Sequence, residues 1–361
     1  MSAAGRGRDD ATGAPVGLPW LVEPLRRTLT TRAAHALLIR GPGNVGQFEL
    51  ALALAKGWLC ERADLALADR PCGRCVGCKL HLARSHPDLL VLLPEALRES
   101  LGWEQGGEGE EGGDASRKKP SKDIRVEAVR AAIAFATTTS ARGRGKFVVV
   151  HPAERMNEVA ASAFLKTLEE PVGDARFLLC SAAPDHLLPT IRSRCQEVPL
   201  AIPDTGAAEA WLVEQGVADA AVMLAAAGGQ PQEAAERAMN GLAAAAWLAL
   251  PRRVALGDAS ALQGWPLPLA VEALQKVCHD ALCLACGGAP RFFPPDRVVA
   301  DASLAALLHW SRELARVSTE AEHPWVVDLA IESLVEQGRE ALKTPRSQHR
   351  EARGLSLHSR R

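Results

Sequence analysis

The chain contains no tyrosine, only 4% aromatic residues and no excess of either charge. Because strands favour aromatic and β-branched side chains, an apolar fraction of 47% that is rich in alanine and leucine argues against a β-sandwich and favours helical layers. The formal net charge of −1 argues against a protein that holds nucleic acid by bulk positive charge, although it allows a local basic patch. A length of 361 residues suggests two or three domains.

The sequence also lacks long apolar runs. No run approaches the ~20 residues needed to span a bilayer. The first ten residues contain no apolar stretch of the kind found in signal peptides. We therefore expect a cytoplasmic protein that does not associate with membranes. In that compartment the nine cysteines are expected to be metal ligands or buried thiols rather than disulfides.

Apolar and helical segments alternate over residues 18–200. Strand-like apolar runs and helical patterns follow one another at residues 35–39, 46–60, 88–93, 124–136, 147–150, 156–169 and 176–180. This alternation predicts an α/β domain whose parallel sheet is joined by crossover helices. After a linker at residues 203–206, the chain up to residue 342 shows only helical patterns.

Three segments have the composition of disordered chain. Residues 1–17 form a lead-in rich in glycine, alanine and charge, and residues about 100–122 form a glycine-rich insertion that is acidic first and basic afterwards. Residues 343–361 form a polar, basic tail. None of the three offers apolar side chains to pack, so we expect solvated, disordered segments.

Four cysteines are spaced C-x11-C-x2-C-x2-C, at Cys60, Cys72, Cys75 and Cys78. Four thiolates at such spacing can close a tetrahedral zinc site that leaves no position open for catalysis. We therefore expect a structural zinc module over residues 60–81. His81 lies close enough to compete as a ligand, but Cys60 completes the better four-thiolate set.

The other five cysteines are expected to be buried thiols. Two of them, Cys180 and Cys195, adjoin apolar runs, and the remaining three lie in an apolar helical pattern. His279 could serve as a fourth ligand to those three, but the pattern favours buried thiols. They are Cys278, Cys283 and Cys286.

Residues 41–48, with the sequence GPGNVGQF, follow a strand and open a helix, which is the context of a phosphate-binding P-loop. Gln47 stands where the motif has the lysine that reaches the β- and γ-phosphates, and Phe48 stands where it has the hydroxyl that binds Mg²⁺. An amide carries no positive charge and a phenyl ring cannot coordinate a hard cation. The glycines of the motif are present, as Gly41, Gly43 and Gly46.

A second position of nucleotide chemistry is altered as well. P-loop ATPases usually place carboxylates after a later strand, to bind Mg²⁺ and to activate water. Here residues 147–150 are followed by His151 and Pro152, and Glu154 is displaced by at least two residues. The combined changes predict that ATP hydrolysis is absent and put nucleotide binding in question. From the residues alone, an ordinary strand-to-helix turn and an active ATPase with unorthodox ligands are the alternatives.

The stretches AFLKTLEEP at residues 163–171 and LPTIRSRCQ at residues 188–196 carry a family resemblance. With the cysteine cluster and the altered loop, they closely resemble the clamp-loader subunits of bacterial DNA polymerase III. The losses at Gln47, Phe48 and His151 make the chain similar to the catalytically degenerate delta-prime branch of that family. The resemblance covers about residues 18–340, apart from the insertion.

The resemblance implies an AAA+ fold. It implies a sheet domain at residues 18–200 with the zinc module inserted, a helical lid at residues 201–241, and a C-terminal helical collar at residues 242–342 that assembles a ring. The implied function is that of a non-catalytic subunit in the ATP-driven loading of a sliding clamp onto primed DNA. The implied partners are the delta and gamma/tau subunits of a DNA-directed DNA polymerase, which is a nucleotidyltransferase.

By the same resemblance, Ser193, Arg194 and Cys195 form the family's SRC motif. Arg194 would then be an arginine finger that reaches the ATP site of a neighbouring subunit and stabilises charge at the γ-phosphate. The alternative is an ordinary salt bridge within the chain, a role better suited to Arg192. A third reading of the whole chain is a zinc-dependent DNA-binding module that contacts phosphates through Arg142, Arg144 and Lys146.

Active relatives carry a lid arginine shortly after a glycine turn. In this chain the turn at residues 228–231 is followed by Gln232, so no cation stands at that step to sense nucleotide. Arg237, further along the same helical stretch, is the candidate substitute.

Overall fold

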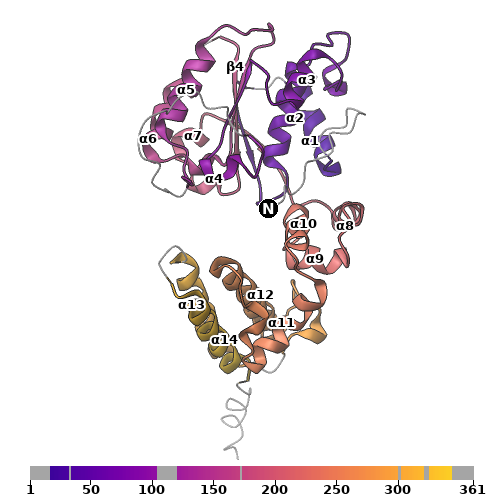
Figure 1. Cartoon of the computed structure of the whole chain (residues 1–361), viewed down its shortest axis with the longest axis vertical. Coiled ribbons are helices and arrows are strands. Elements are labelled where there is room, and N and C mark those ends of the chain that lie inside the picture. The colour runs from indigo at the N-terminus through magenta and orange to yellow at the C-terminus, as the bar shows by residue number, and fades with distance from the viewer. Residues whose placement is uncertain are drawn as a thin grey trace, which may run out of the picture. The chain divides into compact units, whose positions relative to one another are not determined.

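A computed structural model describes residues 17–31, 34–103, 120–170, 173–299, 302–320 and 325–343 (Figure 1). The segments expected to be disordered lie almost entirely outside these residues, as does Pro171. The chain divides into two compact units. The first contains residues 1–211 together with 230–233, and the second contains residues 212–229 and 234–361.

The first unit is built on a parallel sheet of five strands in the order β2-β3-β4-β1-β5. Strands that are buried on both faces read as continuous apolar runs, which is why four of the five could be recognised in the sequence. The fifth, β5, is a polar edge strand that the sequence analysis missed. The strands are β1 (Ala36–Arg40), β2 (Leu89–Leu92), β3 (Lys146–Val150), β4 (Ala175–Ser181) and β5 (Gln196–Pro199).

Helices cover both faces of the sheet (Figure 1). One face carries α1 (Val22–Thr30), α2 (Gln47–Leu59) and α3 (Val76–Leu82), and the other carries α5 (Val126–Thr137) and α6 (Glu158–Glu169). Two short helices, α4 (Glu95–Arg98) and α7 (Pro189–Arg192), complete the unit.

On the α5–α6 face, Phe164 meets Phe177 of β4 edge to face, with ring centroids 5.1 Å apart. Both rings are fully buried, so this core fixes α6 against the sheet.

The second unit contains helices joined by loops, and no strand occurs among its described residues. Its core contains Trp247, which stacks on Phe293 at 4.7 Å, and Trp310, whose indole N–H donates to the carbonyl of Leu334 at 3.0 Å. The helices that lie wholly within it are α9 (Ala220–Ala226), α11 (Ala244–Leu256), α12 (Leu267–Ala285), α13 (Leu304–Thr319) and α14 (Val327–Lys343).

Two further helices, α8 (Thr205–Glu214) and α10 (Pro231–Met239), have residues in both units. The expected AAA+-type α/β fold with a helical C-terminal part is confirmed. The lid and collar boundaries at residues 200 and 241 stay predictions. Among the described helices, none combines the length and the apolar character that a membrane span requires.

Candidate functional site

The altered phosphate loop joins β1 to α2, and its backbone depends on glycine at Gly46. Gly46 has a φ of +102°, and a Cβ at this position would lie 2.8 Å from Cδ1 of Leu21. The indole N–H of Trp20 donates to the carbonyl of Val45 at 2.9 Å. The segment before α1 therefore packs directly against the loop and fixes its shape.

Gln47 uses its side chain inside the loop. Its amide nitrogen donates to the carbonyl oxygens of Gly41 at 3.0 Å and Pro42 at 2.5 Å. The residue is 5% exposed, so these bonds satisfy a buried amide. The position that carries a phosphate-binding lysine in a P-loop thus carries a neutral group bonded to the loop's own backbone.

Phe48 and His151, separated by more than one hundred residues, lie in direct contact. Their rings stack with centroids 4.7 Å apart and an angle of 20° between the planes. Phe48 is 6% exposed, and burial lowers the pKa of His151 to about 4. His151 is therefore neutral near pH 7. The two rings occupy the positions that carry the Mg²⁺-binding hydroxyl and carboxylate in a P-loop ATPase.

Two acidic side chains lie near the loop. Burial raises the pKa of Glu49, whose carboxylate accepts a hydrogen bond from Gln232 at 2.7 Å. Glu154 accepts hydrogen bonds from the backbone N–H groups of Ala182 at 3.0 Å and Ala183 at 3.2 Å. Glu154 is thus engaged with the segment that follows β4.

The four predicted ligands come together. The sulfur atoms of Cys60, Cys72, Cys75 and Cys78 all lie within 4.8 Å of one another. Cys60 follows the last residue of α2, and Cys75 is the N-cap of α3, where its sulfur accepts the N–H of Cys78 at 3.4 Å. At Gly77 a Cβ would lie 2.7 Å from the carbonyl oxygen of Leu59, so the close approach of α3 to the end of α2 requires glycine.

The electrostatics of the cluster fit a bound cation. Burial raises the pKa of Cys60 and Cys78. Burial also acts to raise the pKa of Cys72, but backbone hydrogen bonds from Arg74 and Cys75 outweigh it and lower that pKa to about 6. Buried thiolates are costly without a counter-charge, which a divalent metal ion would supply. The cluster could therefore hold a metal ion.

His81, the competing candidate, stands outside this group of four. It is 8% exposed on α3, and burial lowers its pKa to about 3.

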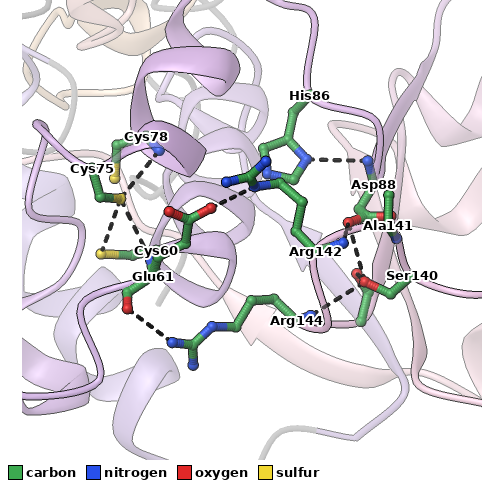
Figure 2. Close-up of polar contacts among 11 residues, drawn as sticks. Cys60, Glu61, Cys75, Cys78, His86, Asp88, Ser140, Ala141, Arg142 and Arg144 are labelled. Atoms are coloured by element: carbon green, nitrogen blue, oxygen red, sulfur yellow. Dashed lines mark hydrogen bonds and ion pairs between the residues drawn. The ribbon is translucent and has the colours of Figure 1, made fainter.

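The cysteine cluster is tied to the loop between α5 and β3 by the residue that follows Cys60 (Figure 2). The guanidinium of Arg142 pairs with the Glu61 carboxylate at 2.5 Å, and Arg144 donates to the Glu61 carbonyl at 3.0 Å. Lys146 pairs with Asp88 at 3.4 Å and lies 4.0 Å from the ring centroid of Phe135.

The structure therefore gives the three cations of the DNA-binding alternative partners within the chain. It does not leave them arranged as a free phosphate-binding patch.

Asp88 holds the same loop from the other side (Figure 2). Its fully buried carboxylate accepts hydrogen bonds from the backbone N–H groups of Ala141 at 2.7 Å and Arg142 at 2.9 Å, and from the hydroxyl of Ser140 at 3.1 Å. Burial acts to raise the pKa of Asp88, but these bonds and Lys146 outweigh it, so the pKa lies below its ordinary value.

We expect Asp88→Asn to lower the free energy of unfolding by about 3 kcal/mol at pH 7, because it leaves the buried Lys146 without a counter-charge. A folded-state pKa below the unfolded value stabilises the protein above the unfolded pKa, and this contribution is lost as pH falls through the folded pKa. The gap between native and variant should therefore close below about pH 4. Urea unfolding, monitored by tryptophan fluorescence, measures the free energy of unfolding of the native protein and the variant. Asp123→Asn, which changes an exposed carboxylate, is the control. Equal losses in the two variants would contradict the role assigned to Asp88.

Arg194 lies in the turn after α7. One terminal nitrogen pairs with the carboxylate of Glu169, the last residue of α6, and the other donates to the carbonyl of Thr190 at 2.8 Å. Its side chain is 32% exposed. The intrachain salt bridge named as an alternative is therefore present, and action on a neighbouring subunit stays a prediction.

The rest of the SRC segment is arranged as follows. Arg192 pairs with Asp185 at 2.9 Å, as expected. The hydroxyl of Ser193 donates to the carbonyl of Thr190 at 3.1 Å. Burial raises the pKa of Cys195 to about 12, so this thiol is uncharged at neutral pH.

The candidate lid arginine is buried in the second unit. Arg237 is 6% exposed and binds both carboxylate oxygens of Glu272 at 2.7 Å. Lys276 pairs with the same carboxylate at 2.5 Å. Arg237, the candidate nucleotide sensor, is therefore already paired with a carboxylate of its own chain.

The second cysteine group divides. Cys278 is buried, with its thiol 3.5 Å from the carbonyl of Leu307. Cys283 is partly exposed and Cys286 is exposed, so the prediction of a buried thiol is wrong at Cys286, which lies beyond the last residue of α12 and leaves the apolar face. Within the described residues these cysteines and His279 do not gather as metal ligands.

Glu61, Asp88 and Glu169 were not predicted as site residues from the sequence. Glu61 adjoins a cysteine ligand, Glu169 belongs to the motif that carried the resemblance, and Asp88 directly precedes strand β2. The signal that the sequence offered for these residues was their position beside these features.

A strand, a glycine-containing loop and a helix, set in a five-stranded parallel sheet, place the first unit among P-loop α/β modules of the AAA+ type. The family model described as "DNA polymerase III, delta subunit" matches residues 20–204, just over half of the chain. The chain belongs to this family.

The chain is similar to curated proteins named DNA polymerase III subunit delta′. It is 38% identical over 202 residues to that of Pseudomonas aeruginosa, which covers 55% of this chain and 54% of the relative. It is 32% identical over 212 residues to that of Escherichia coli, which covers 58% and 56%. The chain therefore spans about half the length of the curated relatives it matches. A solved gamma-subunit-related protein of Thermotoga maritima aligns over 89% of this chain and 99% of its own, with a TM-score of 0.46 and 17% identity.

Proposed function

We propose that the chain is a delta-prime subunit of the bacterial DNA polymerase III clamp loader that does not itself hydrolyse ATP. The stack of Phe48 on His151 carries the proposal. In P-loop ATPases a hydroxyl and a carboxylate at these positions hold Mg²⁺ between them. Two buried rings, one of them a neutral imidazole, offer no ligands for a hard cation.

The charges around the loop support the same conclusion. The lysine position is taken by the neutral Gln47, whose amide is already bonded to loop carbonyls. No positive charge is therefore offered to a triphosphate from this position.

The subunit would contribute to ATP hydrolysis through Arg194, whose side chain would reach into the ATP site of a neighbouring subunit. A guanidinium beside the γ-phosphate stabilises the charge that develops during phosphoryl transfer. The partly exposed position of Arg194, at the end of a short helix, is compatible with such a reach.

The metal of the cysteine cluster is proposed to be zinc. Four thiolates form the donor set of closed structural zinc sites, in which no coordination position is left for a substrate. The ion would supply folding free energy to residues 60–81. The four cysteines would hold it, and the backbone N–H groups that donate to the sulfurs would orient them.

The partners proposed for the chain follow from its family and from the named relatives. They are the delta and gamma/tau subunits, the sliding clamp within the assembly, and primed DNA held by the assembled ring, all in the cytoplasm. The assembly serves a DNA-directed DNA polymerase.

Reconstitution tests this function. The isolated chain is expected to show neither a thermal shift nor hydrolysis with millimolar Mg·ATP. When mixed with delta and gamma/tau subunits it should co-elute with them, and clamp- and DNA-stimulated hydrolysis should fall when it is omitted. Hydrolysis by the chain alone would favour the active-ATPase alternative, and failure to co-elute would exclude the loader role. Salt-dependent binding of primed DNA by the chain alone would favour the DNA-binding alternative.

A further inference from the structure

The arginine of the SRC motif contacts the hydroxyl of Ser193 beside it at 3.4 Å, and it is held by two groups outside that motif, which come from different parts of the chain. Its Nη1 donates to the carbonyl of Thr190 in α7, and its Nη2 pairs with the carboxylate of Glu169, the last residue of α6. The carbonyl is part of a helix backbone and therefore fixed. The carboxylate is the anchor that a substitution can remove.

Two anchors reduce the freedom of a long side chain. A free arginine samples many rotamers, and this conformational entropy must be lost whenever its guanidinium takes up a single position. Because Thr190 and Glu169 already restrict the guanidinium of Arg194, part of that entropy is lost before a ligand arrives. Preorganisation of this kind lowers the barrier of a step that needs the group in one place.

The pair is also weak enough to yield. The side chains of Arg194 and Glu169 are 32% and 47% exposed, and ion pairs exposed to that extent contribute little to stability. A triphosphate carries more negative charge than one carboxylate, so it can draw the guanidinium forward without a large loss. A fully buried partner would hold Arg194 too tightly for transfer.

The neighbouring pair has a different arrangement. Arg192 meets Asp185 on an adjoining turn, and the aspartate side chain is 87% exposed. A single exposed carboxylate restricts a guanidinium little. Of these two arginines, the one in the SRC motif is the one with a second anchor.

We propose that Glu169 is a positioning residue for Arg194, holding its guanidinium within reach of the γ-phosphate bound by a neighbouring subunit. This inference rests on the proposed function of Arg194 as an arginine finger. Glu169 does not touch the nucleotide. It acts by orienting the guanidinium of Arg194. It releases one edge of that guanidinium when the γ-phosphate replaces the carboxylate as its partner.

The test is a kinetic comparison in the assembled loader. Glu169→Gln removes the charge and keeps the shape, and it should lower kcat of clamp-stimulated ATP hydrolysis at the neighbouring site about 3- to 10-fold. KM for ATP should change little, because binding of the nucleotide belongs to the neighbour. Glu169→Asp, which keeps the charge on a shorter side chain, should recover part of the loss.

A double-mutant cycle separates positioning from structure. When Arg194→Ala is present, adding Glu169→Gln should cost nothing further, because the group that Glu169 orients is gone. Glu170→Gln makes the same charge change one residue away and should leave kcat near the native value. The thermal unfolding midpoint of the isolated chain should be the same in Glu169→Gln as in Glu170→Gln.

The outcomes that overturn the inference are distinct from those that overturn the proposed function. If Arg194→Ala leaves hydrolysis unchanged, the finger role fails. If Arg194→Ala lowers hydrolysis but Glu169→Gln does not, or raises it, positioning by Glu169 is excluded. If Glu169→Gln and Glu170→Gln lower kcat equally, the effect is one of surface charge and not of positioning. If Glu169→Gln still lowers kcat when Arg194→Ala is present, Glu169 does not act through Arg194.

Discussion

Replacing Cys78 with serine is expected to abolish metal binding and to unfold residues 60–81 while the five-stranded sheet stays folded. Cys78, like Cys60, is fully buried in a cluster whose four sulfur atoms lie within 4.8 Å of one another. A structural zinc ion contributes about 10–16 kcal/mol of apparent binding free energy to small zinc modules. The α3 segment is seven residues long, which is too short to be stable as an isolated helix.

Hydrogen exchange and metal analysis check this expectation. In the native protein we expect one zinc ion per chain. In Cys78→Ser, or after treatment with a strong chelator, backbone protection over α3 should fall by about 10³-fold, since the segment loses its bound ion, while protection in β1, β3 and β4 persists. Cys286→Ser, which changes an exposed thiol outside the cluster, is the matched control and should keep the metal.

Two results would contradict the assignment. A metal-free native protein would exclude a zinc module. Unchanged protection of α3 after loss of the ion would mean that packing alone holds the segment. Cys72→Ser changes a partly exposed member of the cluster and should also lose the metal. It serves as a second variant in case replacement of the buried Cys78 disrupts folding directly.

Replacing Arg194 with alanine is expected to lower ATP hydrolysis at the adjoining site by about 10³-fold, the lower end of the effect of arginine fingers on kcat. The fall should appear in kcat, because the guanidinium acts on charge that develops during transfer. The chain itself should fold normally, since the half-exposed pair with Glu169 contributes little to stability.

The measurement requires an assembly in which the adjoining site is the only hydrolysing one. Substituting the P-loop lysine of the other ATPase subunits provides it, because that lysine reaches the β- and γ-phosphates. Arg192→Ala removes a neighbouring guanidinium that pairs with Asp185 and is the matched control. If both variants lower the rate equally, or neither does, Arg194 is not the finger. Co-elution of the variant with its partners shows that assembly is intact.

The sequence predicted the buried part of the sheet well because burial leaves a pattern. Strands β1, β3 and β4 are apolar on both faces, and each lies within two residues of its predicted range. The edge strand β5, with the sequence QEVP, carries no such pattern, since a strand with one free edge need not be apolar. Its pairing with β1 is what defines it.

The candidate sites were predictable where chemistry follows spacing along the chain. The four cysteines and the replaced P-loop residues could be read directly. Contacts that join distant residues could not, because Glu61 meets Arg142 across 81 positions and Glu169 meets Arg194 across 25. A lone glutamate on a surface has no periodicity, so its partner becomes known only when the fold brings the two together.

The stack of Phe48 and His151 has a consequence for the evolution of the chain. Returning Phe48 to a small hydroxyl residue leaves a cavity beside the imidazole, and truncation of a buried phenyl ring typically costs about 3–5 kcal/mol. Returning His151 to aspartate buries a carboxylate against a phenyl ring, with no cation at position 47 to balance it. Each single substitution is thus expected to destabilise the chain, so each ring of the stack constrains which residue the other position can carry.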